Sequence, residues 1–282
     1  MKKTVKKQVS APNTIKMGQE CFSERKDTIV CWLGSGGVFI NCRGTLLMVD
    51  PVICRDKGDK MLSEAGYPFL VPPPVAPEDI PRLDGILYTH ADYDHMAPES
   101  AKKLMCTGAR YHGTAFSVNS LENMGIEEAA LCAHNIGERF QIGNVSIQLT
   151  PASHSWQKDR PEFDWCYGPN DCCGYIMETP DGTIWLPGDS ILMKEHLKIR
   201  NIDLMFMDVS TDPYHFGTDA AVRLANQLNP ADLILYHYGT YDAPEKPAFN
   251  ADPSSVEGRI EQPERFHILA PGEIFFLKKK KL

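Results

Sequence analysis

The chain has 282 residues, of which 43% are hydrophobic and 23% are charged, and its net charge is −8 at neutral pH. This is the composition of a globular protein with enough apolar material for one large domain or two small ones, and no apolar run is long enough to span a bilayer. The acidic balance disfavours a polyanionic partner such as nucleic acid.

The nine cysteines are an odd number without CxxC spacing, so they predict no disulfide framework and favour a cytoplasmic location. The N-terminus is basic but has no apolar segment of the kind found in secretory signals. Lysines gather at both ends, at Lys2, Lys3, Lys6, Lys7 and Lys278–Lys281. We assign them no function, since charged, frayed termini are common. We expect residues 1–25 to form an N-terminal arm and residues 26–282 to form a single domain.

Three short strands are predicted near the start of the chain, at Thr28–Leu33, Val38–Asn41 and Thr45–Val49, because apolar residues there are separated by glycine-containing turns. An irregular stretch follows from Asp50 to Pro81. Its proline-rich VPPPVAPEDIP segment excludes a helix or a central strand. We expect this stretch to wrap the surface or to wall a pocket.

The next segment, DGILYTHADYDH, joins a buried strand at Gly85–Thr89 to a loop that carries His90, Asp92, Asp94 and His95. Two imidazoles and two carboxylates within six residues are costly to gather unless a divalent cation binds them. The segment therefore predicts a metal site. The alternative is an acidic, solvated turn that happens to contain two histidines.

Two helices and two hairpins are predicted next. One helix begins at Ala97-Pro98-Glu99, where proline is tolerated in the first turn, and a second covers Ala115–Met124. Apolar residues alternate from Phe140 to Leu149 around a Gly143-Asn144 turn, which predicts a hairpin. The second hairpin pairs Gly174–Glu178 with Thr183–Leu186.

The last third of the chain alternates between strand and helix. In order, we expect a strand at Ile202–Met207, a helix at Asp219–Leu228 capped by Thr218, a strand at Asp232–Tyr236, a helix near Ser255–Arg265 and a strand at Glu273–Leu277. The pattern as a whole predicts an α/β fold of two packed sheets with helices outside.

Further ligand-type residues follow other predicted strands, as His90 does. They are His154, Asp189, Asp208 and His237. Strand ends of this kind converge on one edge of a sheet fold, where sites are built. Each residue alone has an ordinary structural explanation as a turn or cap residue, but together they favour one metal site.

A long loop, residues 155–173, follows His154, and loops of this length in compact domains are usually functional or disordered. We expect Trp156, Trp165 and Tyr167 to line a substrate pocket, with Lys158 or Arg160 reading an anionic group. The alternative is that these aromatic residues fasten the loop to the core. Tyr238, next to His237, is also assigned to the substrate-binding set.

Taken in order, the motifs HADYDH, TPASH, PGDS and LYHYGT resemble those of the metallo-β-lactamase superfamily, whose hallmark is HxHxDH followed by a lone His, a lone Asp and a final His. The resemblance covers Trp32 to Gly272, and it includes Asp50, which commonly supports the metal loop. The chain is most similar to the branch of L-ascorbate-6-phosphate lactonase and N-acylphosphatidylethanolamine-hydrolysing phospholipase D. The resemblance implies an αβ/βα sandwich of two mixed sheets with helices on the outer faces.

By the same resemblance, two divalent ions bind at one edge of the sandwich. One would take His90, Asp92 and His154, the other Asp94, His95 and His237, and Asp189 would bridge both. Asp92 departs from the family pattern, which has histidine there. A carboxylate favours manganese or iron over zinc, and all three metals stay open. The alternative is that Asp92 only supports the ligands and that one ion site is well occupied.

The function implied is hydrolysis of a small ester, a lactone such as a sugar-phosphate lactone, or a phosphodiester. Asp94 would orient or deprotonate the attacking water, and His215 is a candidate proton donor, although it also fits a surface loop histidine. The alternatives are a phospholipase-D-like phosphodiesterase, an iron-dependent redox enzyme and a non-catalytic scaffold. We expect a small, anionic substrate and no nucleic-acid partner, and a homo-oligomer is compatible with the sequence.

Overall fold

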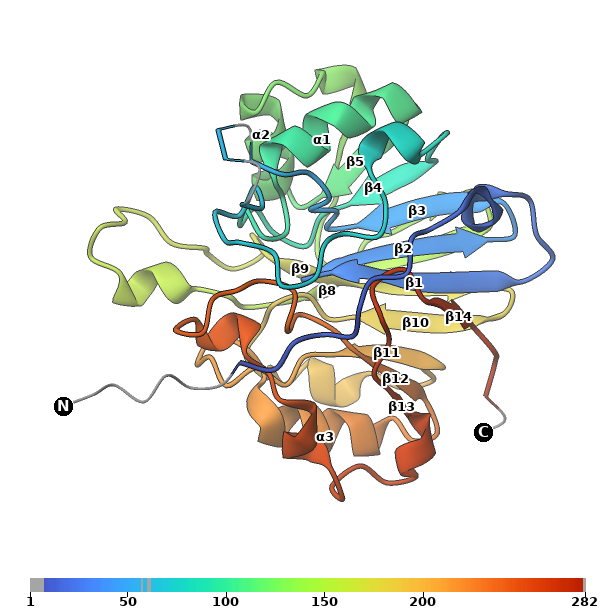
Figure 1. The fold of residues 1–282 in the computed structure, drawn as a ribbon, viewed down its shortest axis with the longest axis vertical. Helices are drawn as coiled ribbons and strands as arrows, with labels where there is room; N and C mark the ends of the chain where they lie inside the picture. Colours follow the sequence, from blue (N-terminus) through green and yellow to red (C-terminus); the bar gives the residue numbers. More distant parts are fainter. Residues whose placement is uncertain (1–7, 57, 60–61, 281–282) are drawn as a thin grey trace.

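In the part of the chain that the structure describes, two mixed seven-stranded β-sheets pack face to face (Figure 1). This computed structural model describes residues 8–56, 58–59 and 62–280. Lys2, Lys3, Lys6, Lys7 and Lys281 lie outside the described residues. The two sheets carry helices on their outer faces, which confirms the predicted αβ/βα sandwich.

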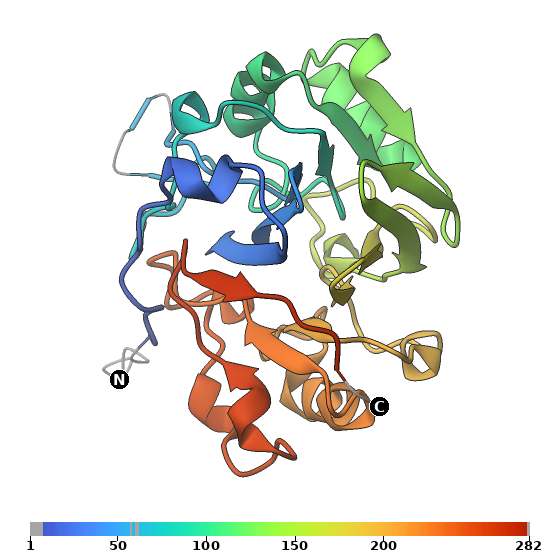
Figure 2. The same ribbon diagram turned by 90° about the vertical axis from the view of Figure 1, so that its right-hand side faces the viewer.

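The first sheet has the strand order β14-β1-β2-β3-β4-β5-β6. Strands β1 to β3 are antiparallel, whereas β3 to β6 run parallel. The pairing of β14 with β1 places the C-terminal strand beside the first strand of the chain (Figure 2). The strands are β1 (Thr28–Gly34), β2 (Gly37–Cys42), β3 (Thr45–Val49), β4 (Gly85–Leu87), β5 (Arg110–Gly113), β6 (Leu131–Ala133) and β14 (Ile274–Phe276).

Strands β2 and β3 are buried along their whole length because both faces of the first sheet are covered. Val38 and Ile40 of β2 belong to the apolar cluster between the sheets, whereas Phe39 belongs to the cluster under the outer helices. Side chains alternate between the two faces of a strand, so a strand covered on both sides reads as an unbroken apolar run. This explains why these strands could be predicted within one residue at each end.

The second sheet has the order β13-β12-β11-β10-β9-β8-β7, with antiparallel pairing from β7 to β10 and parallel pairing from β10 to β13. Both predicted hairpins are present, as β7–β8 and β9–β10. The strands are β7 (Arg139–Ile142), β8 (Val145–Pro151), β9 (Cys173–Thr179), β10 (Gly182–Leu186), β11 (Leu204–Met207), β12 (Asp232–Leu235) and β13 (Phe266–His267).

Three α-helices cover the outer faces of the sheets in the described residues. Helices α1 (Pro98–Leu104) and α2 (Ala115–Asn123) lie over the first sheet, and α3 (Gly217–Gln227) lies over the second (Figure 1). Helix α3 buries Ala221, Leu224 and Ala225, the apolar face expected from their spacing. The predicted cap at Thr218 is wrong, because the helix begins at Gly217 and Phe216 takes the cap position.

The predicted helix near Ser255–Arg265 is also wrong. The segment forms two single 3₁₀ turns, at Pro253–Val256 and Pro263–Arg265. Gly258 between them has a φ of +69°, a left-handed conformation that ends a helix, and Pro263 removes a backbone donor. The short strands β5, β6 and β13 were not predicted, because pairing with a neighbouring strand rather than a local apolar pattern defines them.

Residues that precede the first strand pack on the same core. Met17, Cys21 and Phe22 are buried in the cluster under the outer helices, and the Ala11 amide donates to the Gly239 carbonyl at 2.9 Å. The described helices include none that is both long and apolar enough to cross a membrane. The division into an arm and a domain stays a prediction.

Candidate metal centre and substrate pocket

The loop after β4 is held in place by Asp50, a completely buried carboxylate at the end of β3. Asp50 accepts hydrogen bonds from the Thr89 backbone N–H (2.8 Å) and the Thr89 hydroxyl (2.5 Å), and its Oδ2 lies 2.8 Å from His95 Nδ1. The Thr89 Oγ1 also lies 2.9 Å from His90 Nδ1. Asp50 therefore orients both histidines of the loop, the supporting role implied by the family resemblance.

Backbone strain also marks this edge of the fold. Asp50 (φ +44°) and His237 (φ +60°) both adopt the left-handed conformation that side chains usually avoid. The GSGG turn approaches from the other side, and a Cβ atom at Gly36 would lie 2.3 Å from His95 Cε1. Only glycine fits this close to the imidazole ring, which gives the early glycine-rich turn a place in the site.

The first group of candidate ligands is His90, Asp92 and His154, whose ligand atoms all lie within 4.8 Å of one another. Asp92 Oδ2 is 3.4 Å from His90 Nε2 and 3.4 Å from His154 Nε2. His154 Nδ1 donates to the Tyr214 carbonyl (3.1 Å), so its Nε2 is left to face the group. These are the three residues that the sequence predicted for one ion.

The second group is Asp94, His95, Asp189 and His237, again within 4.8 Å. Asp94 Oδ2 lies 3.4 Å from His237 Nε2 and 3.6 Å from His95 Nε2. Asp189 Oδ2 lies 3.2 Å from His95 Nε2 and 3.3 Å from His237 Nε2, and it is 3.9 Å from His154 Nε2 in the first group. Asp189 thus faces both groups, as expected of a bridging carboxylate.

The donor atoms of this cluster fit a cation better than they fit each other. His95 Nε2 and His237 Nε2 are 3.0 Å apart. Each ring uses Nδ1 as a donor, to Asp50 and to the Ala248 carbonyl (3.1 Å), so the two rings in their neutral form would present lone pairs across this gap. Among the described residues, buried His90 Nε2 and Asp189 Oδ1 have no hydrogen-bond partner. A proton or a divalent cation is needed to reconcile these atoms.

The charges of the cluster also favour a bound cation. Burial alone lowers the pKa of His95 and His237, but Asp189, together with Asp94, outweighs it and holds both pKa values well above the ordinary histidine value. Burial raises the pKa of the Asp189 carboxyl, but the surrounding imidazoles, His237 foremost, bring it well below its usual range. The site therefore keeps its carboxylates ionised and gathers positive charge around them.

His215 and Asp208 form a buried dyad beside the two groups. His215 Nδ1 lies 2.5 Å from Asp208 Oδ2, and the Ser210 backbone N–H donates to Asp208 Oδ1 at 2.7 Å. His215 Nε2 lies 3.5 Å from Asp189 Oδ2 and the residue lines the cavity. The structure thus excludes a surface loop histidine. Asp208, which the sequence placed among the ligand-type residues but in neither ligand set, has the position of an orienting carboxylate.

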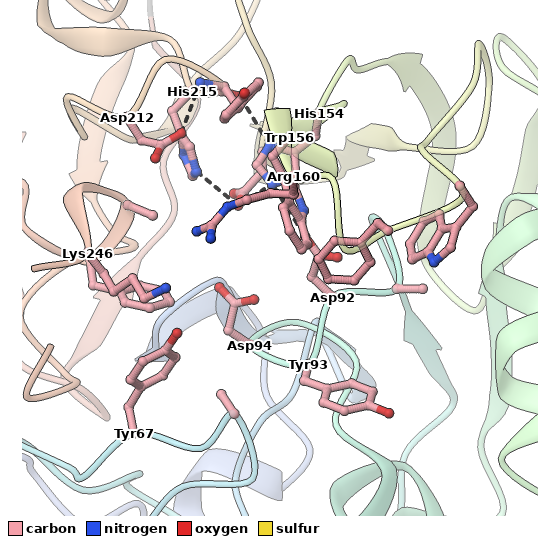
Figure 3. Close-up of a pocket in the computed structure, with 18 residues that line it drawn as sticks. Tyr67, Asp92, Tyr93, Asp94, His154, Trp156, Arg160, Asp212, His215 and Lys246 are labelled. Carbon is pink, nitrogen blue, oxygen red and sulfur yellow. Dashed lines mark hydrogen bonds and ion pairs between the residues drawn. The ribbon is translucent and has the colours of Figure 1, made fainter. Parts of the chain in front are cut away.

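A cavity of about 530 Å³ opens over the candidate ligands. Figure 3 shows Asp94 between two sides of this cavity, with Lys246 and Tyr67 on one side and Trp156 on the other. Besides the ligands and His215, its walls are formed by aromatic and charged residues, including Tyr67, Tyr93, Trp156, Arg160, Phe163, Trp165, Asp212, Tyr214, Lys246 and Phe249. An aromatic, partly cationic pocket of this size suits a small organic substrate.

Some of the predicted substrate-binding residues line the cavity over the candidate ligands, and others do not. Trp156, Trp165 and Arg160 line the cavity, whereas Lys158 lines a separate, neighbouring one. Tyr167 does not line the main cavity, because it is buried with its hydroxyl against Asp92.

The substrate-binding role of Tyr238 is a correction. Its ring is 1% exposed and stacks on Trp32 with ring centroids 5.5 Å apart, in the core between the sheets. Tyr238 follows His237 directly in the sequence, but its ring packs in the core while His237 faces the ligand group. Lys246, Tyr67 and Phe249 were missed by the sequence analysis, since they lie on irregular segments without a motif.

Comparison with known proteins agrees with this geometry. Residues 47–238, which span every candidate ligand, match the family described as Beta-lactamase superfamily domain. A UPF0173 metal-dependent hydrolase of Desulforamulus reducens is 30% identical over 220 residues, 75% of this chain and 90% of the relative. Another, of Pyrobaculum arsenaticum, is 24% identical over 254 residues, 87% of this chain and 98% of the relative. The structure of an isothiocyanate hydrolase from Delia radicum gut bacteria has a similar fold, with a TM-score of 0.68 and 16% identity over 89% of this chain and 99% of that one.

Proposed function

The chain belongs to the metallo-β-lactamase superfamily and is a metal-dependent hydrolase related to the UPF0173 proteins, and on that premise we propose that it uses two divalent cations to hydrolyse a small ester, lactone or phosphodiester. The observation that carries the proposal is the pair of ligand groups that meet at Asp189 under the cavity. His90, Asp92 and His154 would hold one cation, and Asp94, His95 and His237 the other.

A pair of divalent cations bound there would polarise the bond under attack and would lower the pKa of water towards neutrality. Zinc, manganese and iron all suit the mixed imidazole and carboxylate donors. Asp94 is placed to orient the attacking water and to take up its proton, since its carboxylate lies at the floor of the cavity. No serine or cysteine nucleophile is required for this reaction.

The leaving oxygen needs a proton, and His215 is positioned to supply it. The Asp208 carboxylate fixes the imidazole through Nδ1, so Nε2 faces the cavity beside Asp189. We assign His215 as the general acid and Asp208 as its positioning residue.

Among substrates we favour a lactone that carries an anionic group, such as a sugar-phosphate lactone. The order of the motifs resembles the lactonase-like branch, and Arg160 and Lys246 supply positive charge at the cavity. A phosphodiester is the second candidate, since the same cations and the same cavity suit its charge. The nine cysteines are all free, which fits an enzyme that works in the reducing cytoplasm.

The test is a substrate panel on protein loaded with zinc or manganese. A sugar lactone, its 6-phosphate ester and bis(p-nitrophenyl) phosphate separate the two candidates. We expect the phosphorylated lactone to give the highest kcat/KM, and Lys246→Met to raise KM for it about tenfold while Lys246→Arg retains wild-type KM. If hydrolysis is equal with and without added cation, the proposal is wrong.

A further inference from the structure

Asp92 is the one candidate ligand whose residue type departs from the family pattern, and its carboxylate accepts hydrogen bonds from two neutral donors. The Trp156 indole N–H donates to Asp92 Oδ2 at 2.7 Å, and the Tyr167 hydroxyl donates to Asp92 Oδ1 at 2.9 Å. The Tyr167 oxygen in turn accepts from the Ala91 backbone N–H at 3.1 Å. Each carboxylate oxygen therefore has a donor, and one of the donors is itself fixed to the metal loop.

These two hydrogen bonds set the orientation of a short side chain. A carboxylate reaches less far than an imidazole, and it can rotate about its last bond. With the Trp156 and Tyr167 donors in place, Asp92 Oδ2 lies 3.4 Å from both His90 Nε2 and His154 Nε2. Partners that orient a ligand in this way commonly change metal affinity by 10–100-fold when they are lost. The two hydrogen bonds from Trp156 and Tyr167 thus compensate for the shorter reach of the Asp92 side chain.

Both donors belong to the loop of residues 155–173, and they connect Asp92 to the aromatic wall of the cavity. Trp156 packs edge-on against Phe163 with centroids 4.9 Å apart, Phe163 packs against Trp165 at 6.1 Å, and Trp165 packs against Tyr167 at 5.3 Å. The four rings form a continuous row that begins and ends at an Asp92 donor. The wall that would contact substrate and the orientation of Asp92 therefore depend on the same loop.

We propose that Trp156 and Tyr167 are positioning residues that make Asp92 an effective ligand of the first cation, and that this cation fastens the aromatic wall of the pocket. The inference rests on the proposed dinuclear site and deepens it. The alternative, in which Asp92 merely supports its neighbours, predicts instead that binding of neither cation depends on the two aromatic donors.

The experiment is a titration of metal-free protein with Co²⁺, followed by calorimetry and by the visible absorption of the bound ion. The variants are Trp156→Phe and Tyr167→Phe, each of which removes one donor and keeps an aromatic ring. Trp165→Phe is the matched control in the same loop. Tyr111→Phe is the control for loss of one buried tyrosine hydrogen bond, because Tyr111 donates to the Ala101 carbonyl at 2.7 Å, away from the site.

We expect wild type and both controls to bind two equivalents of Co²⁺. In Trp156→Phe and Tyr167→Phe, one equivalent should bind about 10–100-fold more weakly and change its spectrum, while the other keeps its affinity. Unchanged affinities and spectra in both variants, with two equivalents bound in wild type, would overturn this inference alone. Wild-type protein that binds no Co²⁺ would overturn the proposed function as well.

Discussion

Among the described residues, two pairs of histidines have ring nitrogens 3.0 Å apart, yet only one of these pairs lies in a candidate metal site. In the pair His112–His134, His134 donates from Nδ1 to Glu138 Oε1 (2.9 Å), so its Nε2 accepts from His112 Nδ1. In the pair His95–His237, both Nδ1 atoms already donate elsewhere, so two lone pairs would face each other unless a proton or a cation lies between the Nε2 atoms. The hydrogen-bond partner of the other nitrogen in each ring decides whether the two facing nitrogens can form a hydrogen bond or need a cation between them.

The two pairs also differ in the side chains that surround them and in the charge of those side chains. Rings stack around His112 and His134, with the Phe140 centroid 5.0 Å from that of His112, and burial lowers the pKa of His112 to about 3, with His134 and Arg110 adding to the effect. Around His95 and His237 the carboxylates of Asp94 and Asp189 prevail and raise the pKa of both rings. His112 is a neutral ring within a packed aromatic cluster, whereas the pair His95–His237 gathers charge.

The largest expected effect separates the two pairs by activity. His237→Ala removes a candidate ligand from the group that contains Asp189, and we expect kcat/KM to fall by more than about 10³-fold. The loss should be this large because even loss of an outer partner of a metal ligand costs 10–100-fold. His134→Ala, which removes a histidine from the other pair, should change kcat/KM by less than about threefold. Equal losses in the two variants would contradict the distinction.

Removal of cations should destabilise the metal edge and leave the other pair unaffected. A ligand present at 100 times its Kd stabilises a protein by about 2.7 kcal/mol, so a chelator should lower Tm by roughly 5 °C in a chain of this size. Hydrogen exchange should show the loss of protection around His95 and His237, not around His112. Calorimetry with and without chelator gives the first quantity. Identical Tm values would count against bound cations.

The smallest effect concerns acid stability. His112 has a folded pKa of about 3, below its unfolded value of about 6.5. Its contribution to stability is therefore fully present above pH 6.5 and is lost as the pH falls towards 3. At pH 4.5 the loss is roughly 2–3 kcal/mol. Between pH 7 and pH 4.5, His112→Gln should accordingly lose less stability than wild type in urea titrations of metal-free protein. A parallel decline of both proteins would contradict the assigned cause.

The two pairs also show how far the sequence alone leads. His95 stands in a motif with three other ligand-type residues after an apolar strand, and this local density predicted a metal site. The division into two ligand groups, which the structure brings together, was implied by the family resemblance. Asp208 was placed among the ligand-type residues but in neither ligand set, and Tyr167 was expected either to line a substrate pocket or to fasten its loop to the core. Their roles depend on contacts between strands and loops that only the folded chain creates, such as the Tyr167–Asp92 hydrogen bond.

The fold divides in a similar way. Strands with both faces covered, such as β2 and β3, are recognisable in the sequence as apolar runs, and their bounds were predicted closely. Short parallel strands such as β6 and β13 were missed, because tertiary pairing rather than local periodicity defines them. Lys246 and Tyr67 were missed for the same reason, since they reach the cavity from irregular segments.

The most direct test of the central claim is anomalous diffraction from crystals grown with manganese or zinc and no chelator. The account predicts two peaks on either side of Asp189, one beside His90, Asp92 and His154 and the other beside Asp94, His95 and His237. A map without peaks at this edge of the sandwich, or with a peak at His112–His134 instead, would contradict it.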